Sequence, residues 1–110
     1  MLFLNYNQIE IVPNIIGNLL KLKILDLSYN QIKIVPNTIG YLSNLEMLIL
    51  NHNQIEIVPN IIGNLSNLEK INIIGNKING IPNILYILRR NRNRSILVDG
   101  VYLDLDIVGA

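Results

Sequence analysis

The chain has 110 residues, of which half are hydrophobic and 5% are aromatic, and its formal net charge is +1. This length fits one domain with an aliphatic core, and the small charge argues against general attraction to nucleic acid or acidic membranes. The absence of cysteine excludes disulfides, thiol nucleophiles and thiolate metal sites.

No segment has the pattern of a secretory signal or a membrane span. The start, MLFLNYNQIE, lacks a basic region followed by a long apolar stretch. The longest apolar run, ILYIL at 84–88, is far shorter than the roughly 20 residues that a spanning helix needs. We therefore expect a soluble, cytoplasmic protein with no membrane partner.

A 23-residue period organises most of the chain. The segment NQIEIVPNIIGNL occurs at 7–19 and again at 53–65, and a related segment, NQIKIVPNTIGYL, lies between them at 30–42. A weaker version, NKINGIPNILYIL, lies at 76–88. Because the four starts are evenly spaced, the sequence predicts four stacked copies of one structural unit.

Within each unit the pattern predicts a strand followed by a tight turn. Leu25 and Leu27 alternate as on a strand with one buried face. Pro36 cannot donate a hydrogen bond to a sheet, so the strand must end before it. The segment 36–42 is too short for an independent helix, and we expect one turn of α- or 3-10 helix there, with Gly40 permitting a tight or left-handed backbone. Further apolar side chains continue the inward face through the turn: Ile32, Val35, Ile39 and Leu42.

The units share the motif L-x-x-[LI]-x-[LI]-x-x-N-x-I, which begins at Leu22, Leu45 and Leu68, and the first three also share P-x-x-I-G-x-L. This pattern resembles the leucine-rich repeat family, in particular its intracellular 23-residue, Ras-group class, over residues 2 to about 88. The resemblance implies an α/β fold, a short leucine-rich repeat solenoid with a parallel β-sheet on the concave face and short α or 3-10 turns on the convex face. It also implies that the concave face binds protein partners, with signalling scaffolds as a setting.

Asparagine recurs at one position of every unit. We expect these side chains to face inward and to bond backbone groups of the adjacent turn, which would otherwise be buried and unpaired. The members of this predicted structural ladder are Asn7, Asn30, Asn53 and Asn76.

Positions between the inward leucines vary from unit to unit, as expected of a surface with fewer packing constraints. The resemblance to leucine-rich repeat proteins implies that these positions bind a partner on the concave face, where tyrosine is often a binding hot spot. The alternative is that exposed residues without a role have simply drifted. The candidate partner-binding residues form two columns, Phe3, Asp26, Ile49 and Asn72, and beside them Tyr6, Tyr29 and His52.

A second set of positions is expected to be exposed to solvent but carries apolar side chains. Ile11, Ile34 and Ile57 each precede an inward valine, and Ile15 and Ile61 are in similar positions. They could form an apolar stripe on the flank, which favours association. Coding bias towards isoleucine, with partial burial between turns, explains them equally well, and both interpretations stay open.

The ends of the repeat region depart from the pattern. By period, Leu2 matches Leu25, so the first unit is truncated. The chain is then either a truncated or decayed member of a larger family, or it self-associates through an uncapped N-terminal edge. We expect the four repeats over residues 1–90 and a C-terminal capping segment over 91–110. In that segment residues 96–98 predict an extra strand and a hairpin turn is expected next. Its acidic residues are Asp99, Asp104 and Asp106.

Little in the sequence points to catalysis. His52 is the only histidine, with no nucleophile or carboxylate pair at motif spacing, so we predict no enzyme activity, no cofactor and no metal site. The basic cluster from Arg89 to Arg94 fits a patch for nucleic acid or an acidic partner, but we favour a solvated turn offset by nearby aspartates. The preferred function is a non-catalytic protein–protein interaction module with an unidentified protein partner. The alternatives are a purely structural fragment and, last, nucleic-acid binding.

Overall fold

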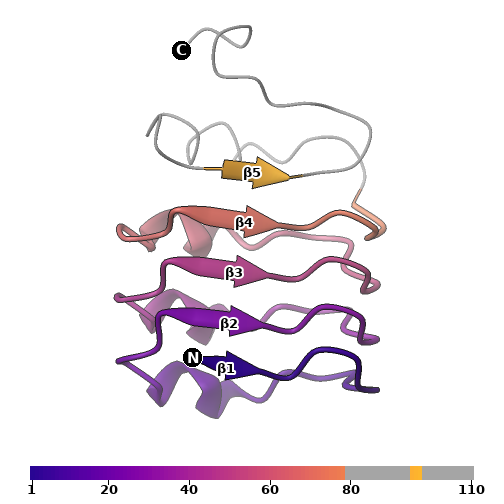
Figure 1. The fold of residues 1–110 in the computed structure, drawn as a ribbon, viewed down its shortest axis with the longest axis horizontal. Coiled ribbons are helices and arrows are strands. Elements are labelled where there is room, and N and C mark those ends of the chain that lie inside the picture. Colours follow the sequence, from indigo (N-terminus) through magenta and orange to yellow (C-terminus); the bar gives the residue numbers. More distant parts are fainter. Residues whose placement is uncertain (79–94, 98–110) are drawn as a thin grey trace, which may run out of the picture.

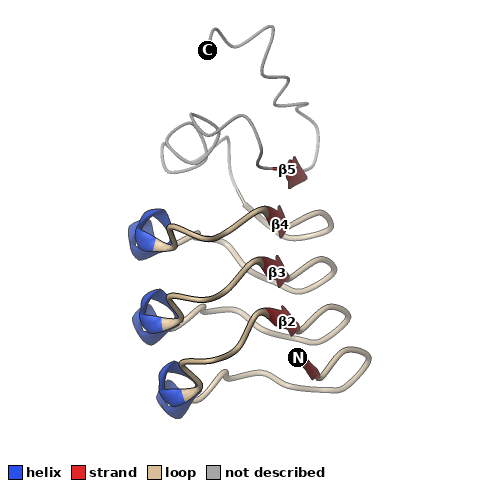
Figure 2. Cartoon of the chain, turned by 60° about the vertical axis from the view of Figure 1, so that its left-hand side comes forward, coloured by secondary structure: helices blue, strands red, loops and turns tan. Residues whose placement is uncertain are grey.

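The computed structural model describes residues 1–78 and 95–97 of the chain. Within them, short strands alternate with 3-10 helices (Figure 1). The strands lie on one side and the helices on the other, so each unit makes one turn of a coil (Figure 2). The elements are, in order, β1 (Leu2–Phe3), η1 (Asn14–Asn18), β2 (Ile24–Asp26), η2 (Asn37–Tyr41), β3 (Met47–Ile49), η3 (Asn60–Asn64), β4 (Lys70–Asn72) and β5 (Ser95–Leu97).

The strands form one parallel sheet in chain order, from β1 to β5. Its register repeats the sequence period, since Leu25 pairs with Leu48, and Leu48 with Ile71, each 23 residues further on. The last pair differs, because Ile71 pairs with Ile96, which is 25 residues further on. The period therefore predicts the pairing of the first four strands, and the unit that ends in β5 is longer.

The core lies between the sheet and the 3-10 helices. Leu25, Leu48 and Ile71 point inward from successive strands and are at most 1% exposed. The buried hydrophobic cluster is wholly aliphatic, as the composition predicts. The apolar residues that were expected to continue the inward face through the second turn are all buried: Ile32, Val35, Ile39 and Leu42.

Each 3-10 helix begins directly after a proline with an extended backbone. Pro36 has φ −70° and ψ 148°, and η2 begins at Asn37. Leu42 then donates its N–H to the carbonyl oxygen of Ile39 at 3.2 Å and closes the turn. The short helix predicted over 36–42 is confirmed, and it is a 3-10 helix.

The glycines of these turns serve close packing. Among the glycines of the described residues only Gly75 has a positive φ, so the left-handed backbone that was one expectation for Gly40 is not adopted. A Cβ atom on Gly17 would lie 2.7 Å from the carbonyl oxygen of Thr38 in the next unit. Adjacent turns therefore approach closely because this position carries no side chain.

The side chain two residues before the glycine of each turn is buried or exposed depending on the neighbouring unit. Ile15 is 67% exposed, as expected. Ile61 lies over Gly40 and packs against the core, partly buried, so for this residue the partial burial between turns that was one of the two open interpretations is confirmed. The same residue type is thus covered in one unit and open in another.

Thr38 occupies the same position in the second unit, and its Oγ1 is buried with no hydrogen-bond partner among the described residues. An unpaired buried hydroxyl destabilises a fold by about 1–3 kcal/mol. Replacing Thr38 with valine, which has nearly the same shape, should therefore raise the free energy of unfolding by about 1 kcal/mol in urea denaturation. Thr38→Ser keeps the hydroxyl, loses a methyl group and should destabilise. A valine variant less stable than the parent would show that the hydroxyl has a partner.

Asparagines near the strand ends join successive units. Asn53 accepts the Ile32 N–H at its Oδ1 at 3.0 Å, and its Nδ2 donates to the carbonyl oxygens of Leu27 and Leu50, both at 3.0 Å. These bonds connect two units and pair backbone groups that the end of the strand leaves without a sheet partner. The equivalent bonds recur at Asn30 and Asn76.

Asn7 departs from this arrangement. Its side chain is exposed, and its Nδ2 donates to the carbonyl oxygens of Leu4 and Asn5 in its own unit, at 3.0 and 3.2 Å. Asn7 makes the same bonds within its own unit as Asn30 does, so its orientation is the one expected of the ladder, but its bonds do not reach an adjacent turn. Burial of this side chain requires a unit stacked on the other side, and the described residues provide none there.

A second asparagine ladder, which the sequence pattern did not reveal, joins the loops after the helices. Asn44 donates from Nδ2 to the carbonyl oxygen of Leu20 at 2.9 Å, and Asn67 donates to that of Ser43 at 2.7 Å. The recurring letters LSN, at 42–44 and 65–67, were the available signal.

Only part of the predicted C-terminal segment lies within the described residues. β5 overlaps the strand expected at 96–98 and extends the sheet beyond β4. The capping role of residues 91–110 stays a prediction. The expected hairpin turn and the other marked charges lie outside the described residues: Asp99, Gly100, Asp104, Asp106 and the arginines from Arg89 to Arg94.

Candidate functional site

The solvent-facing side of the sheet, hereafter the concave face, is built by alternation along each strand. Residues i and i+2 of a strand share a face, so every unit contributes three outward positions around its inward leucines. Down the stack these positions form three columns: Met1, Ile24, Met47 and Lys70; Phe3, Asp26, Ile49 and Asn72; and Asn5, Ser28, Asn51 and Ile74.

The centre of the concave face is apolar. Ile24 and Met47 are neighbours in the register of β2 and β3, and Ile49 lies two residues beyond Met47 on the same side. All three are partly buried, whereas Phe3 on β1 is 58% exposed. Asp26 and Asn72 lie on either side of Ile49 in the register, and Lys70 lies beside Met47, so the face offers an apolar patch with polar neighbours.

Two of the predicted partner-binding residues, Asp26 and Asn72, also accept hydrogen bonds that fix the backbone turn after the strand. The Asp26 carboxylate accepts the Ser28 N–H at 3.0 Å and the Ser28 hydroxyl at 2.6 Å through Oδ1. Asn72 accepts the Ile74 N–H through Oδ1 at 3.1 Å. Such bonds two residues along the chain fix a turn, so these side chains are already held in place without a partner.

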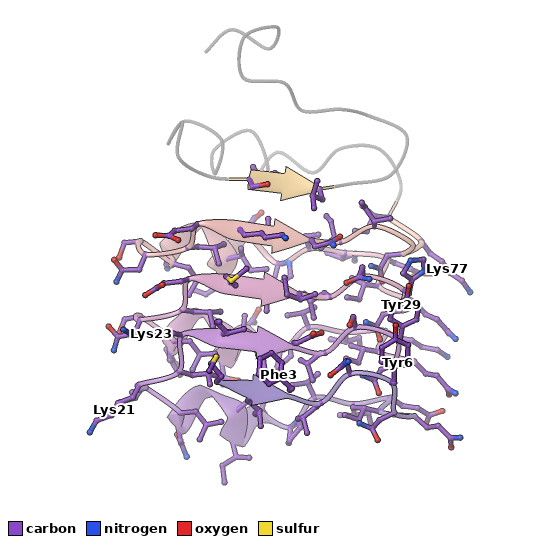
Figure 3. All side chains as sticks on the ribbon, in the orientation of Figure 1. Phe3, Tyr6, Lys21, Lys23, Tyr29 and Lys77 are labelled. Carbon is purple, nitrogen blue, oxygen red and sulfur yellow. The ribbon has the colours of Figure 1, made fainter. Side chains whose placement is uncertain are left out.

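An aromatic ladder, formed by Tyr6, Tyr29 and His52, borders the concave face where the strands end. The rings of Tyr6 and Tyr29 stack at 4.4 Å with 7° between their planes, and those of Tyr29 and His52 stack at 4.5 Å with 17°. Figure 3 shows the two tyrosines one above the other at this edge. The three residues that were predicted to lie side by side are thus placed together by the fold.

The backbone of the aromatic ladder is left-handed. Tyr6, Tyr29 and His52 have φ of 57°, 55° and 57°, so they lie in the turn after the strand and not on the strand itself, where the alternation had placed them. A left-handed backbone costs a residue with a Cβ atom roughly 1–2 kcal/mol. Gly75, with φ 75°, fills the same position in the fourth unit, and a Cβ atom there would lie 2.5 Å from Nδ1 of His52. The imidazole therefore lies over Gly75, where the ladder ends.

Three outward residues escaped the sequence-based prediction. Ile24, Met47 and Lys70 each lie one residue before an inward residue, and only the outward positions that follow it were considered. Extending the period-2 alternation by one residue towards the N-terminus of each strand would have identified them.

Residues that could hold a metal or cofactor are not gathered anywhere in the described part of the chain. No three His, Asp or Glu side chains come together in residues 1–78 and 95–97 in a way that could bind a metal ion. No helix among these residues is long and apolar enough to cross a membrane. The absence of catalysis and cofactors stays a prediction.

One strand and one turn per 23 residues, stacked in chain order around a continuous aliphatic core, define a solenoid repeat protein. A family model described as a leucine-rich repeat region matches residues 1–92. The chain belongs to the leucine-rich repeat family, and the family and fold class predicted from the motif are confirmed. Membership of the Ras-group class stays a prediction.

Solved structures of the same family resemble the chain. A leucine-rich repeat protein of Leptospira interrogans is 33% identical, with a TM-score of 0.71, over 82% of this chain and 23% of that protein. An internalin (inlF) of Listeria monocytogenes is 30% identical, with a TM-score of 0.72, over 91% of this chain and 28% of the internalin. The chain thus spans about a quarter of the length of these proteins. A search of curated proteins gave no match.

Proposed function

We propose that the chain is a non-catalytic protein-interaction module that binds a protein partner through its concave face. The observation that carries this proposal is the composition of that face, which has an apolar centre of Ile24, Met47 and Ile49 and the aromatic ladder along its edge. Leucine-rich repeat proteins generally bind protein partners, which supports the proposal. A cytoplasmic setting within a signalling scaffold is part of the proposal and rests on the 23-residue pattern alone.

Few side chains of the concave face have to become ordered when a partner binds. The apolar side chains at its centre are partly buried in the free protein, and Asp26 and Asn72 are fixed by their own hydrogen bonds. Side chains that are already ordered lose less conformational entropy on association. An apolar centre with a polar border is also the usual anatomy of a protein interface.

The strained backbone of the aromatic ladder is a separate argument that these residues have a functional role. Glycine adopts the left-handed conformation without strain, as Gly75 does, yet two other units carry tyrosine at this position. Strained backbone of this kind occurs preferentially at functional sites, where it holds side chains in place. Tyr6 is 71% exposed and Tyr29 is 41% exposed, so both rings are available to a partner.

Capture from a lysate of the source cells, with quantitative mass spectrometry, tests this proposal. The variant Met47→Glu/Ile49→Glu places two charges in the apolar centre and should reduce retention of the partner at least about tenfold. The matched control Ile34→Glu/Ile57→Glu adds the same charges on the flank and should retain the partner as the parent does. Thermal melts of both variants must first show that they are folded.

Two outcomes would contradict the proposal. Equal retention by the parent and the concave-face variant would place the contact elsewhere. If the parent retained no protein above a bead control, the structural-fragment alternative would be favoured instead.

A further inference from the structure

Three isoleucines on the flank of the solenoid are among the most exposed apolar side chains of the described residues. Ile11, Ile34 and Ile57 are 80%, 75% and 75% exposed. Each directly precedes a buried valine, and Ile11 and Ile34 pair in a parallel β-bridge. The isoleucine stripe, defined by these three residues, therefore runs across three successive units, and backbone pairing joins the first two. It lies outside the concave face, and the proposed function does not use it.

Grooves separate successive isoleucines of the stripe. The groove between the first two units has a volume of ≈ 470 Å³, and that between the second and third units is larger, at ≈ 750 Å³. Ile34 lines both grooves, and Ile57 and Pro59 line the larger one. Each groove also has one acidic and at least one basic residue, so its walls are both apolar and charged.

The charges beside the stripe alternate in sign. Glu10, Lys33 and Glu56 each precede one of the isoleucines and are exposed. The first two line the smaller groove, and Lys33 and Glu56 line the larger one. An occupant of this surface must therefore present an apolar line with charges of alternating sign at the spacing of the units, which is about 4.8 Å in a parallel sheet.

A second copy of the chain meets this requirement when it lies antiparallel. A two-fold axis centred on Ile34 would set Lys33 against its own equivalent, which is repulsive. Moving the axis by half a unit, into the larger groove, sets Lys33 of each copy opposite Glu56 of the other. Both charge pairs are then attractive, and the contact is self-complementary, as a two-fold interface must be.

We propose that the isoleucine stripe is a homodimer interface in which two antiparallel copies meet with an offset of one unit. Ile34 of one copy lies against Ile57 of the other, and Lys33 of each copy pairs with Glu56 of the other. With this offset two isoleucines of each copy, Ile34 and Ile57, face the other copy. They and their surroundings provide less than the roughly 800 Å² per partner of a standard stable interface, so the dimer is weak, with a dissociation constant of about 100 μM.

Sedimentation velocity from about 10 μM to 1 mM tests the proposal. The parent should pass from monomer to dimer over this range. Lys33→Glu and Glu56→Lys should each weaken the association about tenfold or more, because each sets like charges face to face. Lys23→Glu is the matched control for Lys33→Glu, since it changes the net charge equally on an exposed lysine outside the grooves, and it should associate as the parent does.

Mixing the variants provides the decisive comparison. An equimolar mixture of Lys33→Glu and Glu56→Lys restores both attractive pairs, so it should associate about as strongly as the parent. All substituted side chains are exposed, and melting curves should be unchanged. A parent that stays monomeric at 1 mM, a Lys33→Glu variant that associates like the parent, or a mixture that stays monomeric would each overturn the proposal.

Discussion

Replacing Leu48 with alanine is expected to lower the free energy of unfolding by about 3–5 kcal/mol. Leu48 is fully buried at the centre of β3, between Leu25 and Ile71 of the neighbouring strands. Hydrogen bonds between the strands hold these neighbours in place, so the cavity cannot collapse. Since a small domain is stabilised by only about 5–15 kcal/mol, the variant should be close to unfolding.

Ile49→Ala is the matched control for this substitution. Ile49 is the next residue along β3, but it points to the concave face and is only partly buried. Its truncation should cost about 1 kcal/mol or less, because most of the removed surface already faces water. Urea denaturation of both variants measures the difference. Equal destabilisation would mean that the alternation of inward and outward residues is wrong.

Replacing Asn53 with leucine should lower the free energy of unfolding by about 3 kcal/mol or more, because several buried backbone groups would lose their partner together. The N–H of Ile32 and the carbonyl oxygens of Leu27 and Leu50 are bonded to this one side chain. Leucine has nearly the same shape as asparagine, so the substitution removes the hydrogen bonds and leaves little empty space.

Asn7→Leu provides the comparison for Asn53→Leu. The same substitution at Asn7 removes bonds only to Leu4 and Asn5 of its own unit, on an exposed side chain. It should therefore change the free energy of unfolding by less than about 1 kcal/mol in the same urea experiment. If both variants were destabilised equally, the bonds between units would not explain the role of the asparagines.

The sequence predicts the repeated part of the fold well, for a physical reason. Stacked units place the same side chain in the same surroundings, so Leu25, Leu48 and Ile71 carry one packing requirement three times. Pro36 and Leu42 likewise mark the turn, because proline cannot donate to the sheet and the leucine is needed in the core. The period therefore predicts the strand pairing, the inward face and the short helix.

Features set by a neighbouring unit were harder to predict. The burial of Ile61 depends on Gly40 in the preceding turn and not on the identity of Ile61. The left-handed backbone of Tyr29 is equally hidden, because tyrosine has no preference for it; the glycine at position 75 of the same column was the only hint. Of the candidate site, the columns could be predicted from the alternation, including the one that holds Met47, but not the ring stacking.

The two proposed surfaces are independent. The concave face and the isoleucine stripe share no residue, so charge substitutions on one leave the other intact. A chain that binds its partner through the concave face can therefore do so as a monomer or as a weak dimer. Loss of dimerisation in Lys33→Glu should leave partner retention unchanged.

Binding through the concave face is tested most directly by NMR. The ¹⁵N-labelled chain is titrated with the protein that the capture experiment recovers, and the backbone amide signals are followed residue by residue. The largest perturbations are expected at Ile24, Met47 and Ile49 and at Tyr29 in the aromatic ladder. Perturbations confined to the 3-10 helices η1, η2 and η3, with the strand residues unchanged, would contradict binding through this face.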